Sequence, residues 1–273
     1  VKTFLNQFSK HKIKYVCGVP DSVLKDLIYY LENKKHSFTH RVAVNEGGAI
    51  GLATGYHLST KKIPLVYMQN SGLCNAINPL ASSADEKIYS IPMIILIGHR
   101  GKPGEKDEPQ HNKLGPNLFK ILDSIEIKTF RLLKKNYIQT ITKAIKVAKK
   151  KSKPVALVVS KNLLSFKKKK IIARNKKFLR IECIDHILTH KNFKKSKFLG
   201  STGNTARELY FLNEKKKLGH KNSFYNIGAM GHLNQIGFEI AQKSKQKVII
   251  LEGDGSLQMH TGNLAVLGKY KNK

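Results

Sequence analysis

Short apolar runs alternate with helical patterns along most of the chain. The first helical pattern extends to about Lys12, and the second has Asp21 or Ser22 as its expected N-cap. Strands are predicted in the first part of the chain at residues 15–19, 41–44, 65–68, 93–97, 129–133 and 155–159. Strands that alternate with helices at this spacing predict a parallel sheet with helices on both faces.

The pattern is interrupted between residues 165 and 180, where charged residues are dense and apolar periodicity is poor. After this stretch, strands are predicted at 198–201, 224–227 and 247–251, with helices at 181–190, 205–212 and 232–242. We therefore expect an α/β protein with two domains, each a parallel sheet flanked by helices. Their expected bounds are 1–165 and 181–273, with a basic linker at 166–180, and the second domain ends before its sheet is complete.

One candidate site lies where the last predicted strand ends. The apolar run 248–251 is typical of a parallel strand buried on both faces, and Gly253, Asp254 and Gly255 follow it. A carboxylate at the carboxyl end of such a strand can bind a hard cation that bridges phosphates. Many ordinary turns share this short sequence, so the functional interpretation needs a second element.

A second candidate is Glu46, which we expect a buried strand at 41–44 to deliver at its carboxyl end. The helix that follows is rich in glycine and alanine, and each interior glycine costs a helix about 1 kcal/mol. Close packing against another backbone would offset that cost, so the pattern favours a subunit interface that contains an acid. The alternative is a glutamate placed at a helix N-terminus by the helix dipole.

Composition narrows the function classes. The chain has 273 residues and a formal charge of +32, but only six of its 50 basic residues are arginine. Arginine is the preferred residue for phosphate and guanine contacts, so we expect a lysine-rich solvated surface and no nucleic-acid partner. No window is long enough for a membrane span, and the N-terminus lacks a signal-peptide core, so we expect a cytoplasmic protein with no membrane contact. The three cysteines show no paired spacing and are expected to be reduced.

Several motifs then resemble one family. In chain order they are NEGGAIGLATGYHL, VYMQNSGLCNAINPLASSAD, IPMIILIGHRGKPGEKDEPQH, AMGHLNQIG and LEGDGSLQMHTGNLAVLG. Together they resemble the thiamine-diphosphate-dependent 2-oxoacid decarboxylases. The resemblance runs from about residue 16 to residue 267. The motifs are most similar to those of members that act on phosphonopyruvate, and next to those of members that act on sulfopyruvate.

This resemblance implies a pyrimidine-binding domain followed by a diphosphate-binding domain, with thiamine diphosphate and Mg²⁺ held at the interface of two chains in a homo-oligomer. It implies that Glu46 binds the aminopyrimidine ring and is catalytic, and that Asp254 is a magnesium ligand. The other residues implied to bind the cofactor are Asn70, Gly228, Met230, Gly231, Gly253, Gly255 and Ser256. Met230 has ordinary core packing as its alternative.

We expect the substrate, a small 2-oxoacid, at the strand ends and loops of the first domain, where cations and polar groups gather. The candidates are Ser22, Asn45, Ser71, Arg100, Lys106 and Gln110. Asp21 and His111 are candidates for proton transfer, with a helix cap and a solvated loop residue as their alternatives.

The expected reaction is the decarboxylation of phosphonopyruvate to phosphonoacetaldehyde and carbon dioxide, a carboxy-lyase step of phosphonate biosynthesis. Sulfopyruvate is the alternative substrate. A non-catalytic relative is the alternative of another class, because the sequence stops 18 residues after Gly255, before the asparagine pair that the family uses as a second magnesium ligand. We therefore expect a fragment of a longer protein.

Overall fold

A computed structural model describes residues 1–166 and 178–270 of the chain. The chain divides into two compact units, Val1–Lys169 and Lys170–Lys273, and each is described by itself. Most of the linker expected at 166–180, including the lysines at 167–170, lies outside the described residues. The expected domain bounds therefore stay a prediction.

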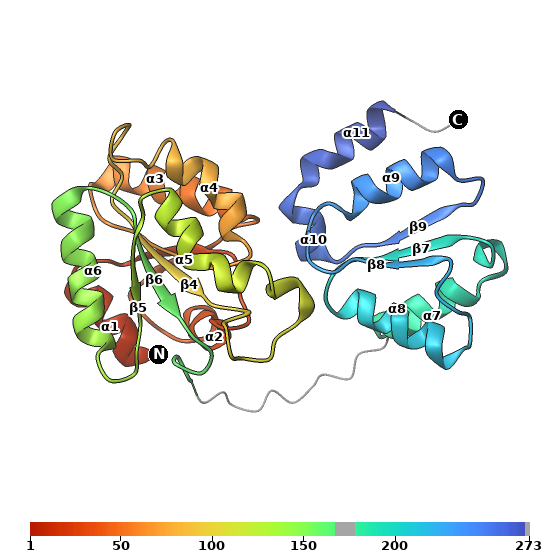
Figure 1. Ribbon diagram of the computed structural model, residues 1–273, viewed down its shortest axis with the longest axis horizontal. Coiled ribbons are helices and arrows are strands. Elements are labelled where there is room, and N and C mark those ends of the chain that lie inside the picture. Colours follow the sequence, from red (N-terminus) through yellow and green to blue (C-terminus); the bar gives the residue numbers. More distant parts are fainter. Residues whose placement is uncertain (167–177, 271–273) are drawn as a thin grey trace. The chain divides into compact units, whose positions relative to one another are not determined.

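The first unit alternates strands and helices (Figure 1). Its strands are β1 (Tyr15–Gly18), β2 (Thr39–Val42), β3 (Leu65–Gln69), β4 (Ile94–Gly98), β5 (Lys128–Arg131) and β6 (Val155–Val159). Its helices are α1 (Lys2–Lys10), α2 (Lys25–Asn33), α3 (Glu46–Thr60), α4 (Leu73–Ala81), η1 (Pro109–His111), α5 (Leu114–Ser124) and α6 (Tyr137–Lys151).

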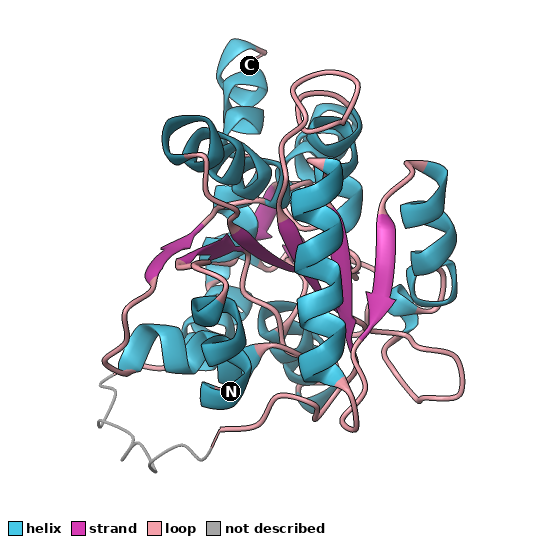
Figure 2. Ribbon diagram, turned by 90° about the vertical axis from the view of Figure 1, so that its left-hand side faces the viewer, coloured by secondary structure: helices cyan, strands magenta, loops and turns pink. Residues whose placement is uncertain are grey.

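The six strands form one parallel sheet in the order β2-β1-β3-β4-β6-β5. Every residue of β4 and β6 is buried, as continuous β-branched runs require of central parallel strands. Apolar residues of α1, α2 and α6 pack on one face of the sheet. Figure 2 shows helices on both sides of the strands. The expected α/β fold with a parallel sheet is therefore confirmed.

Two local expectations in this unit are wrong. The strand expected to be buried at 41–44 is β2, which begins two residues earlier and is largely exposed. Among the described residues it lies at the edge of the sheet with only β1 beside it, so one side of its backbone has no neighbouring strand there. The expected N-cap of α2 is also wrong, because the helix begins at Lys25 with Leu24 as its N-cap. Asp21 still accepts the backbone N–H of Leu24 through Oδ2 at 3.2 Å.

The second unit has a three-stranded parallel sheet in the order β8-β7-β9. Its elements are α7 (Arg180–Thr189), η2 (Lys191–Phe193), β7 (Lys197–Gly200), α8 (Asn204–Lys215), β8 (Ser223–Tyr225), α9 (Leu233–Lys243), β9 (Val248–Leu251), α10 (Asp254–Met259), η3 (Thr261–Asn263) and α11 (Leu264–Lys269). The expectation that β9 is buried on both faces is wrong: all four of its residues are only half-buried. Among the described residues, β9 is an edge strand.

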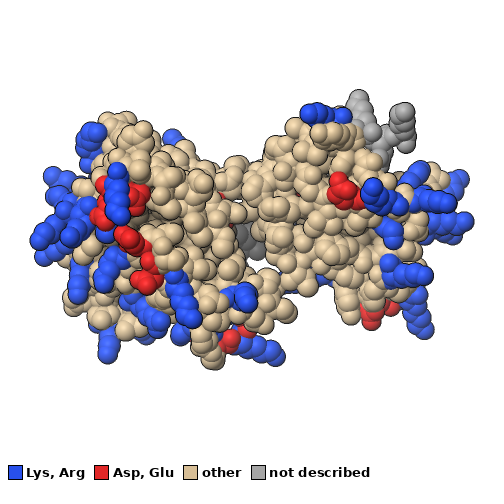
Figure 3. Space-filling view, turned by 45° about the horizontal axis from the view of Figure 1, so that its top comes forward, with Lys and Arg blue, Asp and Glu red and all other residues tan. Residues whose placement is uncertain are grey.

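The surface agrees with a dispersed basic charge. Figure 3 shows lysine and arginine side chains at several places on the visible face of each unit, with a few acids among them and broad areas that carry neither. No helix within the described residues is both long enough and apolar enough to cross a bilayer. All three cysteines are free thiols, and Cys17 is the buried one.

Gly18 tests how tightly β1 and β3 are packed. A Cβ atom at Gly18 would lie 2.0 Å from the Tyr67 carbonyl oxygen, which belongs to the neighbouring strand. We expect Gly18→Ala to lower the free energy of unfolding by roughly 1–3 kcal/mol, because the strands must move apart. Urea denaturation measures this change. Gly268→Ala is the control, because a Cβ there meets nothing within 4 Å among the described residues, and equal losses in both variants would contradict the steric explanation.

Candidate active site

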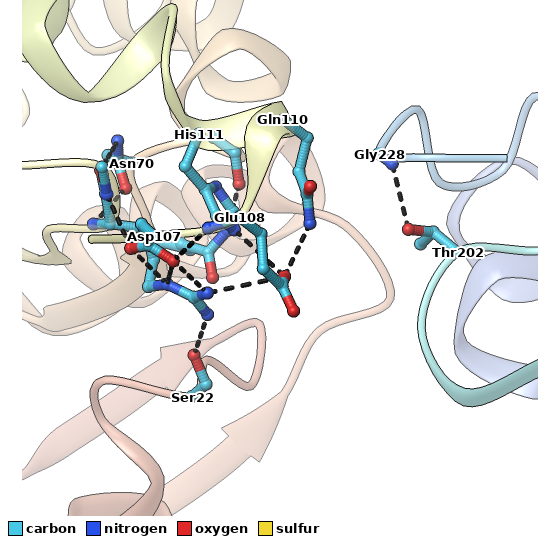
Figure 4. A network of polar contacts seen from close by, with 12 residues as sticks. Ser22, Asn70, Asp107, Glu108, Gln110, His111, Thr202 and Gly228 are labelled. Carbon is cyan, nitrogen blue, oxygen red and sulfur yellow. Dashed lines mark hydrogen bonds and ion pairs between the residues drawn. The ribbon is translucent and has the colours of Figure 1, made fainter. Parts of the chain in front are cut away.

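Polar side chains gather at the carboxyl edge of the six-stranded sheet. The loops after β1, β3, β4 and β6 supply Ser22, Asn70, Arg100 and Lys161, respectively. The carboxyl ends of parallel strands meet at one edge, where open α/β sheets bind ligands. Figure 4 shows part of this cluster.

An ion pair between Arg100 and Asp107 lies at the centre of the cluster. Arg100 donates from Nε to both carboxylate oxygens of Asp107, at 3.0 and 2.9 Å, and from Nη2 at 2.5 Å. Its Nη1 donates to the Ser22 hydroxyl at 2.7 Å. The Asp107 side chain is 2% exposed, and the hydrogen bonds from Arg100 hold the pKa of Asp107 well below its usual range.

Asn70 fixes the start of the loop that carries this pair. Its Oδ1 accepts the Arg100 N–H at 2.8 Å, and its Nδ2 donates to the Arg100 carbonyl at 3.0 Å. Both bonds join the ends of β3 and β4, and Asn70 itself is 2% exposed. Ser71, next in the chain, accepts a hydrogen bond from the Gln69 amide. In this structure Asn70 therefore positions Arg100, and its expected contact with a cofactor stays a prediction.

Asp21 and His111 are buried beside this cluster, at 6% and 5% exposure. Burial raises the pKa of Asp21 from its ordinary value of 3.8 to about 6. Burial, followed by the charge of Arg100, lowers the pKa of His111 below 6.5. Asp21 Oδ1 and His111 Nδ1 have no hydrogen-bond partner among the described residues. Two acid–base groups with unused buried atoms are suited to proton transfer with a ligand.

The close approach of Asp21 to the sheet depends on Gly98, the last residue of β4. A Cβ atom at this position would lie 1.9 Å from Asp21 Oδ2. Any side chain at residue 98 would therefore displace the carboxyl group from the strand end.

Glu46 occupies a comparable position as the first residue of α3. Asn45 is the N-cap of this helix and accepts the Gly48 N–H at 2.7 Å through its side chain. Glu46 is 3% exposed, and its Oε2 accepts a hydrogen bond from Asn75 at 2.9 Å. A Cβ atom at Gly72 would lie 1.9 Å from Glu46 Oε1, so this glycine leaves the space that the carboxylate occupies. The result is a buried carboxylate whose Oε2 is held by Asn75.

In the second unit, the loops after β7, β8 and β9 are joined by backbone hydrogen bonds to hydroxyl groups. Gly253 donates to Ser201 Oγ at 2.8 Å, and Gly231 donates to Ser256 Oγ at 2.9 Å. Gly228 donates to Thr202 Oγ1 at 3.0 Å (Figure 4). Four of the expected cofactor residues, namely Gly228, Gly231, Gly253 and Ser256, therefore lie in one group of connected loops.

Met230 and Gly255 also meet in this group. The Met230 methyl carbon lies 3.9 Å from the place where a Gly255 side chain would begin, and the Met230 side chain is 36% exposed. Asp254 begins α10 and is exposed. Within residues 1–166 and 178–270, no group of three or more His, Cys, Asp or Glu residues could hold a metal ion. Magnesium binding by Asp254 therefore stays a prediction.

The sequence interpretation missed several residues of the first-unit cluster. Asp107, Glu108 and Lys161 were not expected there, although Lys161 follows a predicted strand and the strand-end rule would have pointed to it. Gln110 donates to Glu108 at 2.7 Å, so this expected substrate residue lies at the cluster. Lys106 lies in the same loop and is exposed. The roles expected for these residues stay predictions.

Comparisons with known proteins agree with this arrangement. Residues 2–127 match the thiamine pyrophosphate enzyme, N-terminal TPP binding domain. The chain is 27% identical to phosphonopyruvate decarboxylase of Streptomyces viridochromogenes over 93% of its own length and 66% of that protein. It is 38% identical to the sulfopyruvate decarboxylase alpha subunit of Methanococcus maripaludis, over 43% of its length and 68% of that subunit.

A third relative is the sulfopyruvate decarboxylase beta subunit of Methanocaldococcus jannaschii, which is 32% identical over 34% of this chain and 46% of that subunit. The chain belongs to the family of thiamine pyrophosphate enzymes, as its motifs indicated. Its named relatives of this type are phosphonopyruvate and sulfopyruvate decarboxylases. The chain spans just under two thirds of the length of the phosphonopyruvate decarboxylases it matches.

Asp21 should make the stability of the protein depend on pH, and this dependence can be measured. Because its folded pKa of about 6 exceeds its ordinary 3.8, the folded state holds the proton more tightly than the unfolded state. The stabilisation of the folded state by protonated Asp21 is complete at low pH and is lost as pH rises through the folded pKa. We expect Asp21→Asn to be more stable than wild type by on the order of 2 kcal/mol at about pH 7, with the difference vanishing near pH 3.5.

Chemical denaturation of both proteins across this pH range measures the difference. The asparagine retains an oxygen that can accept the Leu24 N–H, so this hydrogen bond can be preserved. A stability difference that does not change with pH would contradict the assigned pKa.

Proposed function

We propose that this chain is part of a thiamine-diphosphate- and Mg²⁺-dependent decarboxylase that converts phosphonopyruvate to phosphonoacetaldehyde and carbon dioxide, a step of phosphonate biosynthesis. The observation that carries the proposal is the buried Glu46 carboxylate, in a chain of the thiamine pyrophosphate enzyme family. Sulfopyruvate is the second candidate substrate, supported by the 38% identity to a sulfopyruvate decarboxylase alpha subunit.

The residues present fit the cofactor. Glu46 is buried, Asn75 donates to its Oε2, and Oε1 occupies the space that a side chain at Gly72 would fill. A buried carboxyl group in this state can share a proton with a ring nitrogen. In the second unit, hydrogen bonds from Gly231 and Gly253 to hydroxyl groups join the loops beside the exposed Gly255 and the exposed carboxylate of Asp254, a group that can bind the Mg²⁺ of a diphosphate.

Thiamine diphosphate, when bound, would supply the nucleophile and the electron acceptor that decarboxylation of a 2-oxoacid needs. Glu46 would hold the aminopyrimidine ring and exchange a proton with it. Asp254 would hold Mg²⁺, and Met230 would lie beside the cofactor. Asp21 and His111 would protonate and deprotonate the substrate-derived atoms, because burial raises the pKa of Asp21 to about 6 and lowers the pKa of His111.

The substrate would lie at the first-unit cluster, where Arg100 and Ser22 are joined and Gln110 lies close by. Asn45, Ser71 and Lys106 complete the proposed substrate residues. Lysine and arginine suit a substrate that carries a carboxylate and a second, tetrahedral anion.

We also propose that the protein acts as a homo-oligomer with its sites at the interface between chains. Gly51 and Gly55 lie on exposed positions of α3, and a Cβ atom at either would meet nothing within 4 Å in the described part of the chain. The exposed Leu52 and Leu58 lie on the same helix. This glycine-containing surface leaves room for a second chain to approach α3 closely.

The direct test is carbon dioxide release from phosphonopyruvate, sulfopyruvate and pyruvate by the full-length protein, with thiamine diphosphate and Mg²⁺ added or omitted. We expect release only with both cofactors, and fastest from phosphonopyruvate. Fastest release from sulfopyruvate would select the second candidate. A folded full-length protein that releases carbon dioxide from none of these acids would favour a non-catalytic relative.

Glu46→Gln tests the catalytic assignment. We expect at least a hundredfold loss of decarboxylation, since a glutamine cannot exchange the carboxyl proton, while folding is retained. Steady-state kinetics and circular dichroism measure the two properties. Glu32→Gln, on the exposed side of α2, is the matched control and should keep wild-type activity. Equal activity in the two variants would refute the role of Glu46.

A further inference from the structure

Lys161 reaches the first-unit cluster from the loop after β6. Its Nζ lies 3.2 Å from Asp107 Oδ2, and its side chain is 37% exposed. Strands β4 and β6 are neighbours in the sheet, so their carboxyl ends bring Lys161 and Arg100 to the same carboxylate. The charge of Lys161 also lowers the pKa of His111, which places the ammonium group within electrostatic reach of that ring.

The Arg100 guanidinium is largely occupied within the protein. Its Nε and Nη2 form a bidentate pair with Asp107, and its Nη1 donates to Ser22. Glu108 Oε2 is a further neighbour of Arg100, 3.5 Å from Nη2. The two-donor edge that normally recognises a carboxylate or phosphonate is therefore already used, and its charge is balanced by Asp107.

The carboxylate oxygens of Asp107 are also engaged in contacts within the protein. Besides Arg100 and Lys161, it accepts the backbone N–H groups of Gly101 and Glu108, each at 2.8 Å. Its carboxylate is 2% exposed and so offers little surface to a ligand. Lys161 differs from both partners, because an ammonium group has three donors and only one is needed for its contact with Asp107. The remaining donors belong to a partly exposed group at the edge of the cluster.

Resting on the proposed function, we infer that Lys161 binds the tetrahedral anion of the substrate, the phosphonate or sulfonate group, and that Asp107 is its positioning residue. A compact ammonium charge with several donors suits a tetrahedral oxyanion. Arg100 then acts mainly by holding Asp107, which orients Lys161. A 2-oxoacid without the tetrahedral anion would gain nothing from Lys161, so this residue would determine specificity.

The test compares Lys161→Gln and Lys161→Arg with wild type in the full-length protein. We expect Lys161→Gln to raise KM for phosphonopyruvate roughly tenfold to a hundredfold, because a charged hydrogen bond is lost, and to leave KM for pyruvate within about twofold. Lys161→Arg should restore part of the loss. Asp107→Asn should change KM in the same direction. Lys113→Gln, an exposed lysine outside the cluster, is the control and should match wild type.

A binding measurement separates this inference from the proposed reaction. Calorimetry with 3-phosphonopropionate, which has a carboxylate and a phosphonate but no keto group, reports on the anion contact without turnover. Weaker binding to Lys161→Gln than to wild type supports the inference, even if wild type releases no carbon dioxide and the proposed reaction is refuted. Equal binding to both proteins, no binding to wild type, or equal KM changes for phosphonopyruvate and pyruvate would overturn it.

Discussion

The ion pair between Arg100 and Asp107 is the interaction on which the first-unit cluster depends. A carboxylate at 2% exposure is costly unless its charge is balanced, and Asp107 is balanced by a bidentate guanidinium, by an ammonium group and by two backbone N–H groups. These contacts join the loops after β4 and β6. Ser22 and Asn70 extend the network to the loops after β1 and β3, so a charge balance organises four strand ends.

The two other buried acids are accommodated differently. Asp21 and Glu46 lie against Gly98 and Gly72, where any side chain would occupy the position of a carboxylate oxygen. Burial raises the pKa of Asp21, so its proton is released close to neutral pH. The same edge of the sheet thus holds Asp107, whose pKa lies well below its usual range, and an acid whose pKa is raised. The difference comes from whether a cation is in direct contact.

The sequence predicted the strands of both units to within two residues and their parallel arrangement, because their apolar runs are short and separated by helical patterns. The predicted burial was wrong for β2 and β9, since a β-branched run does not reveal whether a strand has neighbours on both sides. Asp107 and Lys161 were missed for a related reason. They are 54 residues apart, and only the neighbouring positions of β4 and β6 bring them together.

Basic side chains lie on both edge strands of the six-stranded sheet. Strand β2 carries His40 and Arg41, and strand β5 carries Lys128 and Arg131. Unpaired edge strands can join those of another copy and extend a sheet into an aggregate, and charged side chains oppose this pairing. Two copies that met edge to edge would bring arginines and lysines together. The positive charge therefore favours separate, finite sheets while leaving the helical surfaces available for specific assembly.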